Sequence, residues 1–440
     1  MNPDFLAAYR DKRCSAEVAA AMIPAGAKVA LGIGAAQPPA LLEALAARAR
    51  AGQIEDVQLY YMLSTAVAAR SVLDLALNDR LRPVSLFHSG VERALDKARR
   101  AGGQGPVDFI PAHFSQVPRV LVEDVAVDTL VTTVSPMDES GHFSFGTNPD
   151  YALPVARSGA RVILEVNRHM PRVRGPGQVH VSRVAAIVEH DSPLTELPGV
   201  PLTPTDEAIG RRIAELVDDG ACLQMGIGAL PDAVCAALKN HRHLGIHTEM
   251  MTSGLAALVR AGVVDNSRKQ IQPGIAVFAF ALGDQPLYAF LADNPACEGH
   301  AVDFVNDPAV ISRNDRVISV NATLEIDLYG ACNSEFVRGR QFSATGGQVD
   351  FVRGAYASKG GRSIIACHAT AVNGTVSRIV PQLSGPVTTS RADTHLVVTE
   401  FGTADLKGKT VRQRAQALIG LADPRFRDGL ERSAWEAGLL

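Results

Sequence analysis

Two similar stretches decide the fold expected of this chain: GAKVALGIGAAQPPALLEAL at residues 26–45 and GACLQMGIGALPDAVCAAL at residues 220–238. In each, an apolar run of strand character ends at closely spaced glycines and passes into an alanine-rich segment of helical pattern. The glycines correspond at a constant offset, as Gly26, Gly32 and Gly34 against Gly220, Gly226 and Gly228. A repeated strand, turn and helix at this separation predicts two copies of one α/β domain.

Further short apolar runs alternate with helical segments along the rest of the chain. Strand-like runs are TLVTTVS (129–135), ARVILEVN (160–167), RVISVN (316–321) and HLVVTE (395–400). This alternation is typical of βαβ units, so the predicted fold class is α/β, with two similar open domains on mostly parallel sheets. Residues 409–439 carry apolar residues at helical spacing, and we expect helices there that pack on the second domain.

The length of the chain and a proline-rich stretch predict the domain limits. A chain of 440 residues exceeds one ordinary core, since single domains run to about 100–200 residues. Between the halves lies DSPLTELPGVPLTPTDEA at 191–208, whose four prolines are expected to preclude regular elements. We therefore predict an amino-terminal domain over 1–190, a linker over 191–208 and a carboxy-terminal domain over 209–440.

Composition and charge narrow the functional classes. Hydrophobic residues make up 47% and charged residues 20%, as in globular proteins, and the net charge of −3 gives no basic field for nucleic acid or an anionic membrane. The amino terminus lacks the apolar core of a secretion signal, and no run of about 18 apolar residues is present. The six cysteines are scattered, as expected of buried thiols in a reducing compartment. We expect a cytoplasmic protein without nucleic-acid or membrane partners.

Two glycine turns are candidate binding sites. GIGALPDAV at 226–234 follows a predicted strand and precedes a helix opened by Pro231, so its backbone N–H groups can meet an anion or a carbonyl oxygen. Its spacing is neither GxGxxG nor a P-loop, and a purely structural turn is the alternative. Gly346 and Gly347 likewise permit close backbone approach before Gln348. The VDFV run that follows has strand character, so a surface hairpin is the alternative there.

A lone carboxylate, Glu249, lies in LGIHTEM at 244–250, close to three histidines. His241, His243 and His247 suggest zinc, but this spacing is no established ligand set and no cysteine is close in sequence, so we predict no metal site. His247 is expected to orient the loop. No GxSxG elbow supports a nucleophilic serine. On its own, Glu249 is typical of a carboxylate at the start of a helix formed by MTSGLAALVR.

A series of motifs across almost the whole chain resembles the acetyl-CoA hydrolase/transferase family. In the second half these are GIGALPDAV (226–234), LGIHTEMMTSG (244–254), NATLEIDLYGACNSE (321–335), TGGQVDFVRGA (345–355) and VTTSRADTHLVVTEFGTADLKGKT (387–410). In the first half they are VSPMDESGHFSFGTN (134–148), ILEVNRHMPRVRG (163–175) and VEHDSPL (188–194). Their order and approximate spacing match as well. The resemblance implies the NagB/RpiA/CoA-transferase-like fold of two open α/β domains.

The resemblance also implies a site. In the family, the glutamate of the matching IHTEM segment becomes a glutamyl-CoA thioester, which makes Glu249 the nucleophile here. The first glycine turn is implied to contact CoA and the acyl group through Gly226, Ile227, Gly228, Ala229 and Leu230. The second completes the site near the thioester through Gly346, Gly347 and Gln348, and Asn321 is a further candidate near CoA. Coenzyme A is then a substrate, with no metal and no tightly bound cofactor.

The implied activity is that of a class I acyl-CoA:carboxylate CoA-transferase acting by a ping-pong mechanism, similar to 4-hydroxybutyrate and butyryl-CoA:acetate CoA-transferases. Its partners would be acyl-CoA and small carboxylic acids, and a homodimer or homotetramer is expected. An acyl-CoA hydrolase is the first alternative, and a non-catalytic CoA- or nucleotide-binding module is the second. Departures from the family pattern at 330–332, 343–345 and 368–369 leave the acid open among 4-hydroxybutyrate, acetate, propionate, butyrate, succinate and itaconate.

Overall fold

The structure, a computed structural model, describes residues 2–440 of the chain. The chain divides into two compact units: Met1–Leu197 with Phe278–Phe304, and Pro198–Val277 with Val305–Leu440. The division after Leu197 falls within the proline-rich stretch. The grouping of 278–304 with the first unit is absent from the domain limits expected from the sequence, and those limits stay a prediction.

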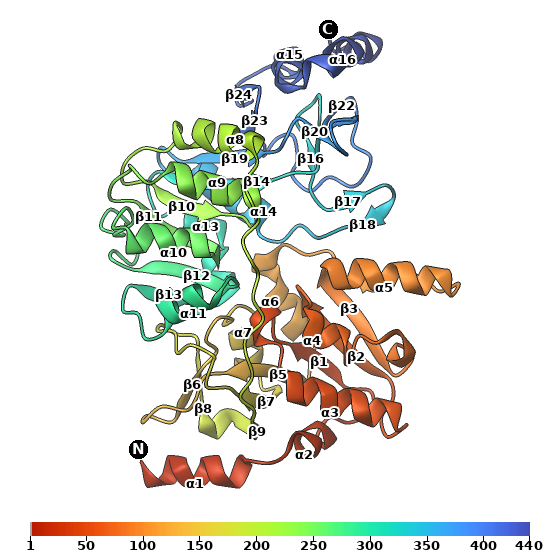
Figure 1. Cartoon of the computed structure of the whole chain (residues 1–440), viewed down its shortest axis with the longest axis vertical. Helices are drawn as coiled ribbons and strands as arrows, with labels where there is room; N and C mark the ends of the chain where they lie inside the picture. Colours follow the sequence, from red (N-terminus) through yellow and green to blue (C-terminus); the bar gives the residue numbers. More distant parts are fainter. Residues whose placement is uncertain (1) are drawn as a thin grey trace. The chain divides into compact units, whose positions relative to one another are not determined.

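The first sheet is a parallel sheet of seven strands (Figure 1). In order across the sheet they are β4 (Asp108–Phe109), β3 (Leu81–Phe87), β2 (Val57–Met62), β1 (Lys28–Leu31), β5 (Thr129–Val134), β7 (Arg161–Val166) and β9 (Val184–Glu189). The chain therefore builds outward from β1 in one direction and then outward from β5 in the other. This order is that of an open, doubly wound α/β sheet.

The second sheet repeats this order with one further edge strand. Its eight strands are β13 (Cys297–Gly299), β12 (Ala276–Ala281), β11 (Gly245–Met251), β10 (Cys222–Met225), β14 (Val317–Ala322), β19 (Arg362–Ala366), β23 (Leu396–Thr399) and β24 (Gly402–Asp405). The pairs from β11 to β23 are parallel, and the edge strand β24 is antiparallel to β23. The shared order confirms the predicted fold class, two similar open α/β domains with mostly parallel sheets.

Helices connect the strands, and small β ladders complete the fold. The helices up to residue 200 are α1 (Pro3–Lys12), α2 (Ala16–Ala21), α3 (Pro39–Arg50), α4 (Ala66–Ala69), α5 (Gly90–Ala101), α6 (Val117–Arg119) and α7 (Ala152–Arg157). Those that follow are α8 (Pro204–Ala214), α9 (Ala229–Ala237), α10 (Ser253–Arg260), α11 (Gln285–Leu291), α12 (Val302–Val305), α13 (Pro308–Ile311), α14 (Gln348–Ala357), α15 (Val411–Leu421) and α16 (Pro424–Glu436). The short strands are β6 (His142–Ser144), β8 (Gln178–His180), β15 (Glu325–Asp327), β16 (Cys332–Asn333), β17 (Phe336–Val337), β18 (Arg340–Gln341), β20 (Thr370–Ala371), β21 (Val376–Ser377) and β22 (Ile379–Val380). Single 3-10 or π turns are η1 (Gly34–Ala36), η2 (Leu75–Leu77), η3 (Phe114–Gln116), η4 (Val120–Asp124) and η5 (Val181–Arg183).

Local sequence explains why these elements form. All six residues of β5, TLVTTV, are buried, and such β-branched runs suit a parallel sheet that is covered on both faces. Helix α8 begins at a capping box in which Thr203 and Asp206 cap each other's backbone, with Pro204 at the first helical position. The expectation that prolines keep 204–208 irregular is therefore wrong. Proline lacks an N–H, but the first turn of a helix leaves that group without an intrahelical partner anyway.

Three other local expectations differ from the structure. The VDFV run at 349–352 lies inside α14 and forms neither a strand nor a hairpin, because a run of four residues is too short to separate the helical period from the strand period. Glu249 does not start a helix: it lies in β11, and α10 begins at Ser253 with Thr252 as its N-cap. Helix α9 starts at Ala229, so Pro231 lies within its first turn rather than opening it.

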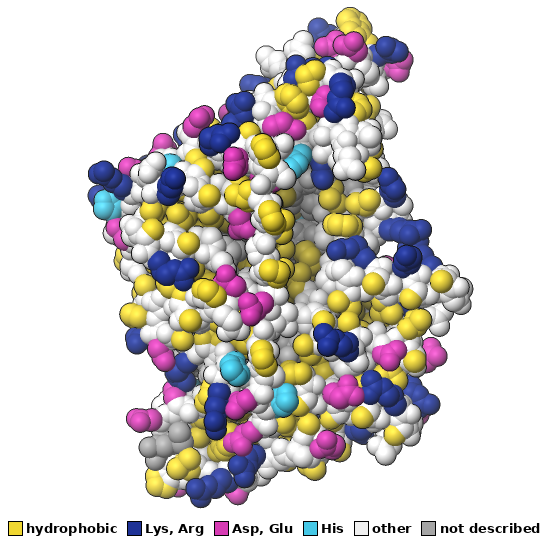
Figure 2. Space-filling view, viewed as in Figure 1, with side chains coloured by type: hydrophobic (Ala, Val, Ile, Leu, Met, Phe, Trp, Pro, Cys, Tyr) yellow, Lys and Arg dark blue, Asp and Glu magenta, His cyan; other side chains and the backbone are white. Residues whose placement is uncertain are grey.

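The carboxy-terminal helices pack on the second unit, as predicted. Leu418 of α15 and Leu430 of α16 share a buried cluster with Ile365 of β19 and Val397 of β23. On the face shown in Figure 2, basic and acidic side chains are interspersed, in keeping with the small net charge. None of the helices between residues 2 and 440 combines the length and the hydropathy that a bilayer-spanning helix requires.

Candidate active site

The sheet order brings most of the predicted site residues to one edge of the second sheet. The direction of strand order reverses beside β10, with β11 on one side and β14 on the other. Ligands of open α/β sheets bind outside the carboxyl ends of the strands at such a point. The turn at 226–228 follows β10, Glu249 lies in the second half of β11, and Asn321 lies near the end of β14. The fold therefore places the first glycine turn, Glu249 and Asn321 where a ligand is expected.

The Glu249 carboxylate is half-buried and is held by two donors. The side-chain amide of Asn306 donates from Nδ2 to Glu249 Oε2 at 2.6 Å, and the backbone N–H of Gly347 also donates to this carboxylate. Asn306 is fully buried, directly after α12, and its Oδ1 accepts no hydrogen bond from the described residues. Gly347 is the N-cap of α14. A side-chain amide and a helix N-terminus thus hold one carboxylate from two different segments.

Position 347 requires a glycine, because the Glu249 carboxylate and the Asn306 amide lie directly against its backbone. A Cβ added at Gly347 would overlap Glu249 Oε2 and Asn306 Nδ2. Its backbone has φ −94°, which any residue can adopt, so the requirement is steric rather than conformational. The structure therefore brings one residue of the second glycine turn into direct contact with Glu249.

The surroundings of Glu249 shift its ionisation. Burial raises the pKa of Glu249 to about 7, the hydrogen bonds from Asn306 and Gly347 pull it down, and the nearby carboxylate of Asp350 pushes it up. Asp350 is buried on α14, one turn from Gly347. A carboxyl whose pKa is raised toward neutrality and that accepts hydrogen bonds from two donors is typical of a functional group rather than of a surface glutamate.

The first glycine turn opens helix α9 with exposed backbone. Gly228 has φ 105°, a left-handed value that favours glycine, and it caps α9 without a side-chain hydrogen bond. Ile227 is 47% exposed, an unusual position for isoleucine. The first N–H groups of a helix have no intrahelical acceptor, so this end of α9 can receive an anion or a carbonyl oxygen. The turn is joined to β11 through Met225, whose N–H donates to Thr248 Oγ1 at 3.4 Å.

Asn321 and Gln348 bind other side chains rather than Glu249. Asn321 is nearly buried and pairs with Gln224 of β10, donating from Nδ2 to Oε1 at 3.1 Å. The Gln348 amide is buried and donates to Thr389 Oγ1 at 2.9 Å. These hydrogen bonds join β14 to β10 and the second glycine turn to Thr389, and the parts of Asn321 and Gln348 in binding stay predictions.

The three histidines close to Glu249 have separate partners. Nε2 of His241 lies 3.0 Å from the Val217 carbonyl, His243 pairs with Asp265 at 2.7 Å, and His247 meets the Val305 carbonyl at 2.8 Å. Between residues 2 and 440 no group of three or more His, Cys, Asp or Glu side chains could hold a metal ion. His247 lies in β11 rather than in a loop.

Sequence reasoning missed Asn306 and Asp350. Asn306 lies in DFVND at 303–307, outside every motif quoted above, and nothing in its local pattern points to Glu249. Asp350 belongs to the TGGQVDFVRGA motif, but a strand there would have given no reason to direct it toward Glu249. With a helix capped at Gly347, the carboxylate in its first turn would have been a candidate.

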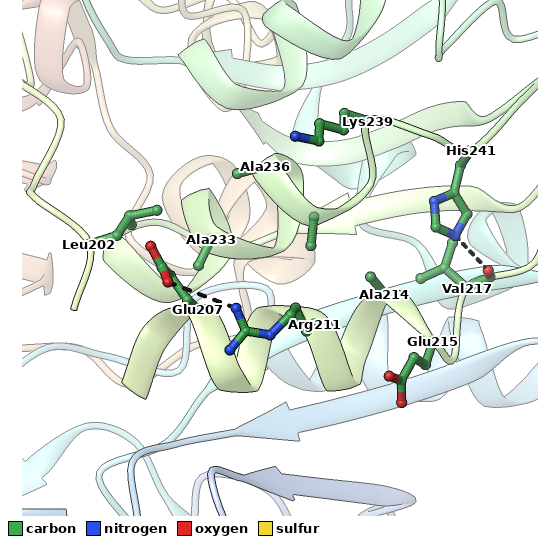
Figure 3. Close-up of a pocket in the computed structure, with 11 residues that line it drawn as sticks. Leu202, Glu207, Arg211, Ala214, Glu215, Val217, Ala233, Ala236, Lys239 and His241 are labelled. Atoms are coloured by element: carbon green, nitrogen blue, oxygen red, sulfur yellow. Dashed lines mark hydrogen bonds and ion pairs between the residues drawn. The ribbon is translucent and has the colours of Figure 1, made fainter. Parts of the chain in front are cut away.

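A surface pocket of about 760 Å³ lies elsewhere on the second unit (Figure 3). It is lined by residues of α8 and α9 and of the segments beside them, among them several alanines and the charged Glu207, Arg211 and Lys239. Its lining includes neither Glu249 nor a residue of the glycine turns. It is therefore distinct from the candidate site.

Comparison with known proteins identifies the family. The acetyl-CoA hydrolase/transferase N-terminal domain matches residues 3–197, and the acetyl-CoA hydrolase/transferase C-terminal domain matches residues 283–434. The chain belongs to the acetyl-CoA hydrolase/transferase family. This confirms the family expected from the motifs, and with it the prediction of an enzyme of the CoA-transferase type.

Individual members of the acetyl-CoA hydrolase/transferase family match over nearly the full length. The chain is 43% identical to succinyl-CoA:cyclohexane-1-carboxylate CoA transferase of Geobacter metallireducens, over 97% of this chain and 95% of the relative. It is 41% identical to 4-hydroxybutyrate coenzyme A transferase of Clostridium kluyveri, over 96% and 97%. The crystal structure of RipA from Yersinia pestis is 51% identical, with a TM-score of 0.97 and coverage of 100% of both chains. These relatives include enzymes named for the transfer of CoA between acids.

Proposed function

We propose that this protein is an acyl-CoA:carboxylate CoA-transferase that moves CoA between short-chain or dicarboxylic acids through a thioester at Glu249. The observation that carries the proposal is the Glu249 carboxylate, half-buried at the carboxyl edge of the sheet and held by Asn306 and the Gly347 N–H. The names of the relatives, which are CoA transferases acting on succinyl-CoA or 4-hydroxybutyrate, support the same class of reaction.

The first half-reaction has two steps. A Glu249 oxygen attacks the thioester carbon of acyl-CoA, the C–S bond breaks, and CoA leaves as a thiolate beside a mixed anhydride of Glu249 and the acyl group. The thiolate then attacks the glutamyl carbonyl carbon, and the bond to the acyl carboxylate breaks. The free acid departs, and Glu249 carries CoA as a thioester. A second carboxylate reverses these steps, so CoA passes to a new acid with no net change in the number of thioesters.

Asn306 and Gly347 are the donors proposed to stabilise the second step. When the thiolate attacks the glutamyl carbonyl, negative charge develops on the oxygen that stays on Glu249. The Asn306 amide and the Gly347 N–H already donate to this carboxylate, so they need little reorganisation to meet that charge. One such donor can be worth about 2.7–4 kcal/mol in the transition state.

The remaining predicted residues are proposed to hold the substrate or its binding loops. The turn Gly226, Ile227, Gly228, Ala229 and Leu230 would receive the acyl-CoA carbonyl or the pantetheine arm at the open end of α9. Gly346, with φ 54°, shapes the approach to Gly347. Asn321 and Gln348 keep β14 and the second glycine turn in place through Gln224 and Thr389. Binding of CoA far from the thioester can offset the cost of desolvating the reacting groups.

The experiment that tests this function separates transfer from hydrolysis, the alternative that the family name also covers. The protein is incubated with acyl-CoA alone and with each of acetate, propionate, butyrate, succinate, 4-hydroxybutyrate and itaconate, while new acyl-CoA and free CoA thiol are measured. A transferase forms a new acyl-CoA only when a second acid is present. Release of free thiol at the same rate without an acid would instead establish a hydrolase.

Glu249→Gln is the matched variant for this assay, because the amide keeps the size of the side chain but cannot be acylated in the same way. We expect no measurable CoA exchange. Turnover at the wild-type rate would remove Glu249 from the mechanism and with it the proposed route.

Other properties stay predictions from the sequence. These are a cytoplasmic location, a homodimer or homotetramer, the absence of nucleic-acid and membrane partners, and a reaction without a metal or a tightly bound cofactor.

A further inference from the structure

His247 contacts both segments that hold Glu249. The two residues lie two positions apart in β11, so their side chains point to the same face of the sheet. The His247 side chain is fully buried, and its ring lies 6.4 Å from that of Phe351, at an angle of 56°. Phe351 belongs to the first turn of α14 and donates its N–H to the Gly347 carbonyl at 3.0 Å. The ring of His247 therefore lies next to the first turn of the helix whose N-cap residue, Gly347, donates its N–H to Glu249.

The hydrogen bond of His247 reaches the other segment. Nε2 lies 2.8 Å from the Val305 carbonyl oxygen, and because a carbonyl only accepts, Nε2 carries the proton of this bond. The peptide group of that carbonyl continues into Asn306, so the bond fixes the direction in which the Asn306 side chain leaves the backbone. The flanking helices α12 and α13 have four residues each, too few to hold that peptide by their own hydrogen bonds.

We propose that His247 is a positioning residue for CoA transfer: its Nε2–H holds the Val305 carbonyl, and this aims the Asn306 amide at the Glu249 carboxylate. The inference rests on the proposed function of Glu249, and His247 itself touches no reacting atom. The chain of contacts is short, from Nε2 to the Val305 oxygen and from Asn306 Nδ2 to Glu249 Oε2. Rotation of the 305–306 peptide would break the second bond without moving Glu249.

Three substitutions at this position separate the hydrogen bond from the bulk of the ring. His247→Leu removes the donor and keeps an apolar side chain, His247→Gln keeps an N–H at a similar reach, and His247→Asn keeps an amide that is too short for the Val305 carbonyl. For Leu and Asn we expect kcat to fall about 10- to 100-fold while KM for acyl-CoA changes less than about threefold. The Gln variant should recover to within about fivefold of wild type. If the Leu variant does not fold, the comparison of Asn with Gln decides.

The pH profile supplies a readout that simple loss of folded protein would not move. Because Asn306 stabilises the ionised carboxylate, losing its donor should raise the pKa of Glu249 and shift the acidic limb of kcat/KM to higher pH in the Leu and Asn variants. Asp350, the charged group that faces Glu249 from α14, is unchanged in all of them and cannot cause the shift. A lower amplitude with an unmoved limb would overturn the positioning role.

His241 provides the matched control. Its Nε2 also bonds a backbone carbonyl, that of Val217 at 3.0 Å, but neither residue touches Glu249 or its donors. His241→Leu should keep kcat within about twofold of wild type and leave the acidic limb of the pH profile at the same pH. In parallel, the Glu249-CoA adduct is measured by mass. If the wild type forms the adduct and His247→Leu forms it equally fast, only the positioning role of His247 fails. If the wild type forms no adduct, the proposed function fails, and this inference with it.

Discussion

The Glu249 carboxylate accepts hydrogen bonds from one side-chain donor and one backbone donor, and the two respond differently to mutation. The Asn306 amide is a side chain, whereas the Gly347 N–H belongs to the backbone and persists in every variant except proline. The backbone donor can nevertheless be displaced, because the space beside it is filled by the carboxylate itself. A methyl group at Gly347 would have to share that space with Glu249 Oε2 and Asn306 Nδ2.

Gly347→Ala should therefore lower kcat/KM by about 100-fold or more, since a displacement of about 1 Å at a reacting group can have this effect. Thermal unfolding should show a folded protein. Gly429→Ala is the control, because Gly429 lies inside α16 and an added Cβ there meets no neighbouring atom. That variant should keep full activity. Wild-type activity in Gly347→Ala would mean that the carboxylate does not work in the position described.

Burial is the main cause of the raised pKa of Glu249, and the charge of Asp350 adds to it, so Asp350 should contribute to the pH dependence of the reaction. Glu249 attacks as a carboxylate, so the rate of the first half-reaction should rise as the pH passes the Glu249 pKa of about 7. Asp350→Asn removes the charge that raises this pKa, so the acidic limb should move to lower pH by about half a unit or more. Asp393→Asn is the control, because Asp393 pairs with Arg353 instead. A limb that moves equally in both variants would contradict this assignment.

Among the single elements, the sequence predicts the helices and strands whose pattern is clear within a short stretch of residues. β1 with α3, and β10 with α9, follow from an apolar run, glycines and an alanine-rich helix. β11 was missed because IHTEM mixes polar and apolar residues, and its place among parallel neighbours gives it strand structure despite its local pattern. The contact of Asn306 with Glu249 joins segments far apart in the chain, so no local rule could find it. Helix α14 was expected to be a strand because the expectation rested on the four residues VDFV alone.

Helix α8 offers a test of element stability that is separate from the proposed chemistry. Asp206 caps the helix through Thr203 and also bonds His368 Nε2 at 2.7 Å. Asp206→Ala removes both, so the free energy of unfolding should fall by about 1–3 kcal/mol in urea titrations. Glu207→Ala, in the same helical turn, removes only an exposed 3.8 Å ion pair with Arg211 and should change stability by less than about 0.5 kcal/mol. Equal losses would rule out a special role for the Asp206 cap.

At the scale of the whole molecule, two sheets of the same strand order carry one candidate nucleophile. Lys28 pairs with Gln58 in the first sheet as Cys222 pairs with Gly245 in the second, and Lys28 corresponds to Cys222 in the repeat. Met62 in β2 is as far from Gln58 as Glu249 in β11 is from Gly245, so Met62 is the position in the repeat that corresponds to Glu249. A methionine cannot be acylated and exchanged as a carboxylate can. The repeat could be predicted from the sequence, but the grouping of 278–304 with the first unit could not, because it depends on contacts between distant segments.

The proposed thioester at Glu249 can be detected as CoA bound covalently to the chain. The protein is mixed with acyl-CoA without an acceptor acid, quenched and weighed intact. A second portion is treated with hydroxylamine, which releases the CoA and leaves a hydroxamate on the side chain that carried it, and its peptides are then mapped. We expect one CoA per intact chain and a hydroxamate on the peptide that contains Glu249. The CoA should be discharged when a carboxylic acid is added, and it should be absent in Glu249→Gln. CoA on another residue, more than one CoA per chain, or transfer of CoA to a second acid with no adduct at Glu249 would rule out the proposed thioester.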